Sequence, residues 1–178
     1  MEKEFLPIGL VMHQKGNGAS RNGSSSGNYR SGAELTVTMK NGLERHVTIT
    51  DPKDADRIPK IMEKVNNGSD SAAYQLAGII KKYDQIAAGS ILLGHGYTGE
   101  GWEAIGNGFD ELSVHDEAIN AYKLSAVAGH LCGKCKLGQY YAEGKGCNKN
   151  LELAKLLLEE AATQCDSAEE ILDQYGLR

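Results

Sequence analysis

The sequence predicts a mainly α-helical protein: a short α-α superhelix of helix-pair repeats, preceded by a small N-terminal β-hairpin element. Apolar residues recur at helical spacing from residue 53 onward, and two stretches of the C-terminal half match at an offset of 36 residues. Residues 35–50 instead alternate between apolar and polar side chains around an Asn-Gly pair. We therefore expect a β element in residues 1–52 and a helical repeat domain in residues 53–178.

The β element begins with a short apolar segment, residues 5–13, that predicts a strand. Segments 35–39 and 47–50 alternate, and the Asn41-Gly42 pair between them favours a tight type I′ turn, in which both central residues take positive φ. A two-stranded hairpin is only marginally stable, so the first segment is the expected third strand of a small sheet.

Residues 15–32 hold five Gly, five Ser and three Asn, with almost nothing apolar. Such a segment cannot bury enough surface to offset the entropy lost on ordering it, so we expect a mobile loop. Two roles stay open for it: a flexible connection, or a lid that covers a substrate.

The first helix is expected to start shortly after residue 53. Asp54 or Asp56 would cap it, which leaves Pro59 in or near the first turn, where a helix tolerates proline. The apolar residues that follow recur every three or four positions and predict one buried face: Ile58, Ile61, Met62 and Val65.

The rest of the chain predicts further helices with one interruption. Ser69 or Ser71 opens a second helix, and residues 86–93 predict a weaker third. Six glycines between 94 and 108 surround Trp102 and predict an irregular segment over 94–115. Helical patterning then returns in four segments: 116–128, 131–142, 151–164 and 167–175.

The internal repeat is carried by two of these helices. Ala118 aligns with Ala154 and Tyr122 aligns with Leu158, each 36 residues apart. Small residues at such positions let neighbouring helices approach closely, and the larger ones fill the gap beside them. A repeat of this length, built from two helices and two tight turns, is typical of a helical solenoid.

Three motifs in this region resemble the Sel-one-like repeat, a relative of the tetratricopeptide repeat: Ala126-Val-Ala-Gly129-His130, Leu137-Gly138-Gln-Tyr140-Tyr141-Ala-Glu-Gly144-Lys-Gly146, and Asn148-Lys-Asn-Leu-Glu-Leu-Ala154. The resemblance covers about residues 53–176 and is strong only over 116–165. Cys147 stands where the family usually has an aliphatic residue, Asn150 stands where Asp is usual, and Leu153 replaces Lys.

The resemblance implies an adaptor that holds another protein in a groove and needs no catalytic residues or cofactor. The groove would be lined by the first helix of each pair, 116–128 and 151–164. The outward residues expected to bind the partner are Asn120, Lys123, Lys155 and Glu159. Two alternatives stay open: an immunity-type inhibitor that binds a toxin, and a ligand-binding protein or enzyme that uses the glycine-rich 94–108 loop.

Charge and hydropathy exclude several classes of function. A net charge of -5 does not suit a protein that must neutralise phosphates, so no nucleic-acid partner is expected. No window approaches the ~20 apolar residues of a membrane span, and the first residues do not form a secretory signal. We therefore expect a cytoplasmic protein with reduced cysteines.

Two motifs point to chemistry only weakly. Residues 94–99 match G-x-G-x-x-G, but a dinucleotide site needs a strand before this motif and a helix directly after it. His130, Cys132, Cys135 and Cys147 are potential zinc ligands, yet the C-x-x-C pair lacks a second pair, and we expect no metal. Cys135 is instead predicted to be a buried packing thiol. The cysteines do not recur with the repeat, which argues against a disulfide scaffold.

Overall fold

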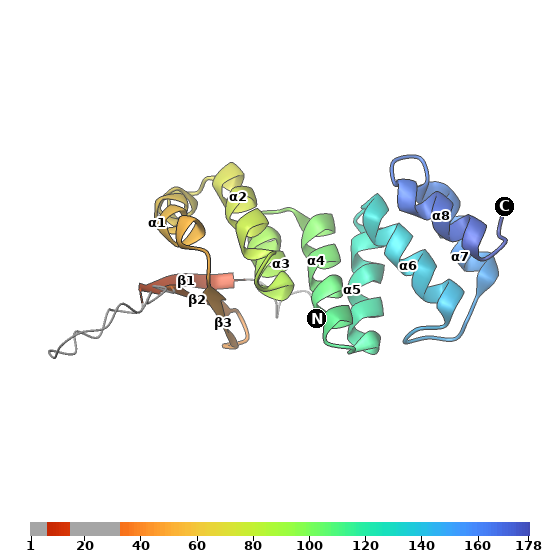
Figure 1. The fold of residues 1–178 in the computed structure, drawn as a ribbon, viewed down its shortest axis with the longest axis horizontal. Helices are drawn as coiled ribbons and strands as arrows, with labels where there is room; N and C mark the ends of the chain where they lie inside the picture. Colours follow the sequence, from red (N-terminus) through yellow and green to blue (C-terminus); the bar gives the residue numbers. More distant parts are fainter. Residues whose placement is uncertain (1–6, 15–32) are drawn as a thin grey trace, which may run out of the picture.

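The computed structural model describes residues 7–14 and 33–178. Over these ranges the protein is mainly helical, with a three-stranded antiparallel sheet followed by eight helices that pack in sequence (Figure 1). The predicted fold class is confirmed. The loop predicted over residues 15–32 lies outside the described residues.

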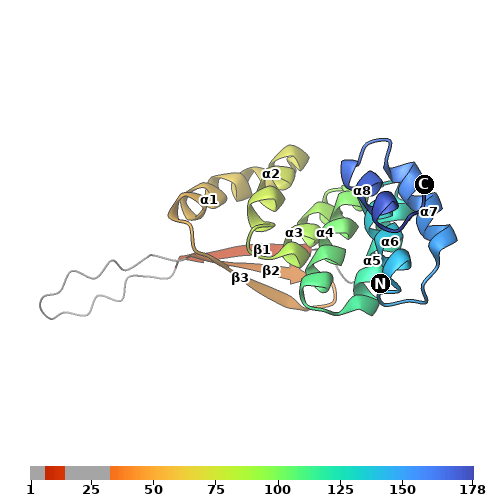
Figure 2. The same ribbon diagram turned by 45° about the vertical axis from the view of Figure 1, so that its right-hand side comes forward.

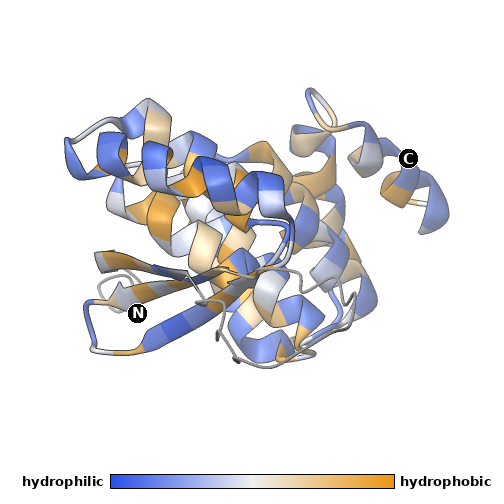
Figure 3. Cartoon of the chain, turned by 60° about the vertical axis from the view of Figure 1, so that its left-hand side comes forward, coloured by the Kyte–Doolittle hydropathy of each residue, from blue (hydrophilic) through white to orange (hydrophobic). Residues whose placement is uncertain are grey.

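The sheet consists of β1 (Pro7–Gln14), β2 (Ala33–Met39) and β3 (Glu44–Ile49). β2 lies in the middle and pairs antiparallel with both neighbours, so the predicted third strand is confirmed. Leu35 and Val37 of β2 are fully buried and belong to a core shared with the first three helices. The sheet runs beneath these helices (Figure 2), and apolar residues occur both on the strands and on the helices above them (Figure 3).

The hairpin turn differs from the prediction. Among the described residues only Ser113 and seven glycines have positive φ, so Asn41 does not and a two-residue type I′ turn is wrong. The Gly42 N–H donates to the Met39 carbonyl at 2.9 Å, and the Met39 N–H donates to the Leu43 carbonyl at 2.8 Å. This is a three-residue loop in which glycine alone supplies the left-handed position, with φ of 82°.

The helices follow one another with short connections, and each packs against the next. Their bounds are α1 (Pro52–Asn66), α2 (Asp70–Ile80), α3 (Gln85–Gly94), α4 (Thr98–Glu111), α5 (His115–Val127), α6 (Leu131–Glu143), α7 (Leu151–Ala161) and α8 (Asp166–Gln174). Short connections bring consecutive helices into antiparallel contact, which gives the extended stack in Figure 1.

The start of α1 was predicted too late in the chain. Asp51, rather than Asp54 or Asp56, caps the helix by accepting a hydrogen bond from the Lys53 N–H at 2.8 Å. Pro52 takes the first helical position, where its missing N–H costs nothing. Pro59 consequently lies inside the helix instead of in its first turn. Asp followed by Pro favours a helix start more strongly than an isolated Asp does. This preference outweighs the destabilisation of the helix by Pro59.

The irregular segment predicted over 94–115 is also wrong, because α4 occupies most of it. Its glycines lie where helices meet closely. A Cβ on Gly101 would come within 2.8 Å of the Leu93 side chain, and one on Gly106 within 2.6 Å of the Tyr122 ring. The low helix propensity of glycine is therefore offset by packing that a larger residue would prevent.

An aromatic and ionic network fixes α6 to α4. The rings of Tyr122 and Tyr140 meet edge to face with centroids 5.1 Å apart. The Tyr140 hydroxyl donates to Asp110 Oδ1 at 2.7 Å, and Lys145 Nζ lies 2.5 Å from the same oxygen. Burial alone would raise the pKa of Asp110, but these bonds from Lys145 and Tyr140 hold the pKa below its usual value.

This network predicts an acid-sensitive contribution to stability. The pKa of Asp110 is lower in the folded protein than in the unfolded chain. The ionised side chain therefore stabilises the folded state fully above the unfolded pKa of ~3.9, and this stabilisation is lost as the pH falls through the folded pKa. Asp110→Asn should lower the free energy of unfolding by about 1 kcal/mol at pH 7 and lose less stability on acidification than the wild type. Urea unfolding between pH 7 and pH 3 measures both effects. Equal pH dependence of the two proteins would contradict the assignment.

Candidate functional site

Two adjoining open cavities lie along α2, the first half of α4 and the start of α6, and they extend to Leu92 of α3 and to the end of α7. One, of about 310 Å³, is lined by Tyr74, Ala77, Gly78, Lys81, Leu92, Glu100, Glu103, His130 and Cys132. The other, of about 370 Å³, is lined by Gly129, His130, Leu131, Cys132, Lys134, Glu160 and Gln164. Because His130 and Cys132 line both, we treat them as one surface and call these residues the α2–α4–α6 groove.

His130 stands at the centre of the groove because of the turn before it. Gly129 takes a left-handed conformation with φ of 83°, which ends α5 and places His130 at the N-cap of α6. The imidazole packs on Gly99, where a Cβ would lie 2.6 Å from the Cβ of His130. The side chain is therefore held against the first turn of α4.

A buried serine orients the His130 ring. The Ser125 hydroxyl donates to the Gly99 carbonyl at 2.7 Å and lies 3.4 Å from His130 Nδ1. A hydroxyl has a single hydrogen, and Ser125 donates it to the Gly99 carbonyl. His130 Nδ1 must therefore be the donor in its contact with the Ser125 oxygen. In the neutral ring this leaves Nε2 as a hydrogen-bond acceptor.

The rim of the groove carries charges of both signs. Lys81 Nζ lies 3.4 Å from Glu103, and Lys134 forms an ion pair with Glu160. Glu100 also lines the groove, and no ion pair to it occurs within the described residues. The rim therefore has one more carboxylate than ammonium group, and Glu100 is available for a basic partner group.

The lining at the α2 end is largely apolar. Tyr74 is 51% exposed and its ring lies 5.0 Å from that of Tyr97. Gly78 has nothing within 4 Å of the position of a Cβ, and the largely buried Ala77 and Leu92 line the cavity beside it. This part of the groove suits an apolar side chain packed beside an aromatic ring.

Cys132 is not an activated nucleophile. Burial raises the pKa of its thiol, and the negative charges of Cys165 and Glu103 raise it further. A raised pKa leaves little of the reactive thiolate form at neutral pH, so Cys132 is not expected to be the first thiol to react.

The four residues predicted to bind a partner lie elsewhere. Asn120 is half-buried and Lys123 exposed on α5, while Lys155 and Glu159 form an ion pair with each other at 3.6 Å on α7. None of them lines either cavity of the groove, and α6 packs against both α5 and α7. Their role in binding stays a prediction. The sequence feature that could have predicted the position of the groove is the Gly129-His130 pair, which the sequence indicates only as part of the repeat motif.

The other chemical motifs are also placed by the structure. The G-x-G-x-x-G match at 94–99 follows the helix α3, so the strand that a dinucleotide site requires is not there. Cys135 is buried, as predicted, and Cys147 contacts the Tyr140 carbonyl near the far end of α6. Within residues 7–14 and 33–178, no cluster of His, Cys, Asp or Glu is arranged to hold a metal ion.

No helix in the described part of the chain is long and apolar enough to cross a membrane. In comparisons with known proteins, no family model matches the chain, and no curated protein or solved structure shows significant similarity to it.

Proposed function

We propose that the protein is a non-catalytic scaffold of the Sel-one-like type, which holds an extended segment of a partner protein in the α2–α4–α6 groove. The helix pairs support the first part of this proposal. α5 begins at His115 and α7 at Leu151, an offset of 36, while α6 begins at Leu131 and α8 at Asp166, an offset of 35. Successive pairs of nearly equal length stack into an elongated surface, which is how helical repeats bind extended partners.

The observation that carries the proposal is that two open cavities adjoin through His130 and Cys132 across successive helices. The helix α4 is held to its neighbours by close glycine contacts, so the surface is largely formed before binding. A preformed surface reduces the entropy lost when a partner docks. An apolar floor with a charged rim is the usual composition of a specific interface.

The lining defines the chemistry of the segment it would hold. An aliphatic or aromatic side chain packs against Tyr74 and the floor at Gly78. A Lys or Arg of the segment pairs with Glu100, which has no ion pair of its own in the described part of the chain. The expected ligand is therefore an extended peptide with an apolar residue close to a basic one.

Selection from a displayed library of random peptides tests this function. Enriched sequences should combine an apolar residue with a nearby Lys or Arg and bind the purified protein. Tyr74→Ala removes the aromatic wall and Glu100→Lys reverses the rim charge, and each should weaken binding about tenfold or more. Fluorescence anisotropy with the selected peptides measures the change.

The matched control is on the α5 and α7 face. Lys123→Glu and Lys155→Glu reverse exposed or half-exposed charges outside the groove and should leave the affinity within about twofold. Loss of binding in these controls with no effect of the groove variants would move the binding surface to the residues predicted from sequence. A library that yields no binding sequence would overturn the scaffold proposal.

A further inference from the structure

Three of the four cysteines meet where α6 contacts the start of α8. Cys132 and Cys135 lie one turn apart on α6, and Cys165 is the N-cap residue of α8. Cys135 is buried, Cys165 is half-buried and Cys132 is exposed. These residues contribute nothing to the binding proposed above except that Cys132 lines the groove.

A serine hydroxyl bridges two of the sulfurs. Ser167 Oγ lies 3.0 Å from Cys165 Sγ and 3.7 Å from Cys135 Sγ. The two sulfurs are therefore separated by no more than the sum of these distances. Cys165 and Cys135 belong to different helix pairs, so a bond between them would join the last pair to the one before it.

We propose that Cys165, Cys135 and Ser167 form a peroxide-responsive thiol site, in which Cys165 is oxidised first and then forms a disulfide with Cys135. This role is independent of partner binding in the groove.

The environment distinguishes the two thiols. Burial would raise the pKa of Cys165, but hydrogen bonding to Ser167 and to the neighbouring thiols outweighs this effect and lowers the pKa below that of an ordinary thiol. Burial raises the pKa of Cys135 to about 11. Cys165 is therefore the thiolate that forms first, and it lies at a helix N-terminus, where backbone N–H groups favour a negative charge.

The reaction balances with hydrogen peroxide as the only oxidant. The Cys165 thiolate attacks one peroxide oxygen, the O–O bond breaks, and the departing hydroxide takes up a proton to give water and a sulfenic acid. The sulfur of Cys135 then attacks the sulfur of Cys165. The S–S bond forms as the S–O bond breaks, and the hydroxide leaves as water with the proton of Cys135. Two thiols are oxidised and one peroxide is reduced.

Access and movement fit this sequence of steps. Cys165 is only half-buried and follows Gln164, which lines the groove, so a small peroxide can reach it. Cys165 precedes α8, and α8 contacts α6 only lightly. Because Ala168 in the first turn of α8 is fully buried, the two sulfurs must approach through the Cys165 side chain and the connection before α8.

Peptide mapping after peroxide treatment tests the proposal. The reduced protein is exposed to hydrogen peroxide at pH 7 with dimedone to trap sulfenic acid, then alkylated and digested with trypsin. Cleavage after Lys134 separates Cys132 from Cys135, so the linked residue is identified directly. The wild type and the control Cys147→Ser should both yield an intramolecular Cys135–Cys165 disulfide. Cys135→Ser should instead accumulate dimedone adduct on Cys165.

The role of Ser167 has a separate readout. Ser167→Ala removes a hydrogen bond to the Cys165 thiolate and should slow its alkylation by iodoacetamide about fivefold at pH 7, with Cys147 as the internal reference. An unmodified Cys165 after peroxide treatment would overturn the proposal. So would a disulfide mapped to Cys132 or formed between two copies of the chain.

Discussion

Gly89→Ala is expected to lower the free energy of unfolding by about 2 kcal/mol, although alanine is the better helix former. A Cβ at this position in α3 would lie 2.5 Å from the Gly101 carbonyl oxygen and 2.7 Å from the Ile105 side chain. The first contact is with the backbone of α4, which cannot rotate away as a side chain can. The two helices must therefore separate, and the core between them loses contacts.

Gly78→Ala is the matched control. This glycine is also inside a helix, but it is exposed and nothing lies within 4 Å of a Cβ placed on it. The same substitution should therefore stabilise the protein by up to about 1 kcal/mol, the difference in helix propensity. Urea denaturation followed by circular dichroism measures both changes. Equal effects at the two sites would mean that α3 and α4 are not in close contact at Gly89.

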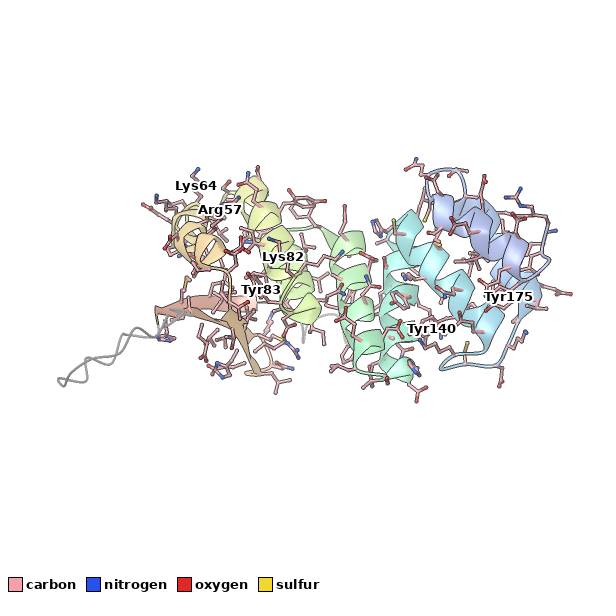
Figure 4. All side chains as sticks on the ribbon, viewed as in Figure 1. Arg57, Lys64, Lys82, Tyr83, Tyr140 and Tyr175 are labelled. Carbon is pink, nitrogen blue, oxygen red and sulfur yellow. The ribbon has the colours of Figure 1, made fainter. Side chains whose placement is uncertain are left out.

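Asp54→Ala is expected to cost about 3 kcal/mol, the largest loss among these variants. The carboxylate of α1 is 4% exposed and lies 3.1 Å from Lys82 Nζ, and it accepts a hydrogen bond from the Tyr83 hydroxyl at 2.8 Å. Lys82 and Tyr83 follow α2 and lie close to α1 in Figure 4. Removing the carboxylate leaves the Tyr83 hydroxyl without the acceptor of its hydrogen bond and removes the ionic contact between α1 and Lys82.

The pH dependence gives the Asp54 prediction a second test. Burial would raise the pKa of Asp54, but hydrogen bonds from Tyr83 and Lys82 outweigh it and lower the pKa. The loss caused by Asp54→Ala should therefore be complete at neutral pH and shrink as the pH falls through the folded pKa. The control Asp56→Ala removes an exposed carboxylate of the same helix and should change stability by less than about 0.5 kcal/mol. A similar loss in both variants would contradict the buried role of Asp54.

The sequence was sufficient to predict the elements whose signals are local. The alternating strands of the sheet and the four C-terminal helices were found from apolar periodicity, because one face of each is buried. The turn at Asn41-Gly42 was placed correctly, although its type was not. Helix starts were less certain where several Asp or Ser residues compete, as at Asp51 and Asp54.

The sequence did not predict the elements that depend on contacts between helices. The glycines of α4 indicate an irregular segment when they are considered alone, and only the proximity of α3 and α5 explains why they are helical. The groove likewise depends on His130 meeting Gly99 from another helix pair. Cys165 lies 30 residues after Cys135 in the sequence, so no local spacing indicates that their sulfurs share a serine.

Chemical-shift mapping tests the central claim of a peptide-binding groove most directly. A peptide selected for binding is titrated into isotope-labelled protein while the backbone amide signals are followed. We expect the largest shifts at Tyr74, Glu100, His130 and Cys132, with little change at Asn120, Lys123, Lys155 and Glu159. Shifts confined to the latter four residues, or spread evenly over the chain, would contradict the assignment of the α2–α4–α6 groove as the binding surface.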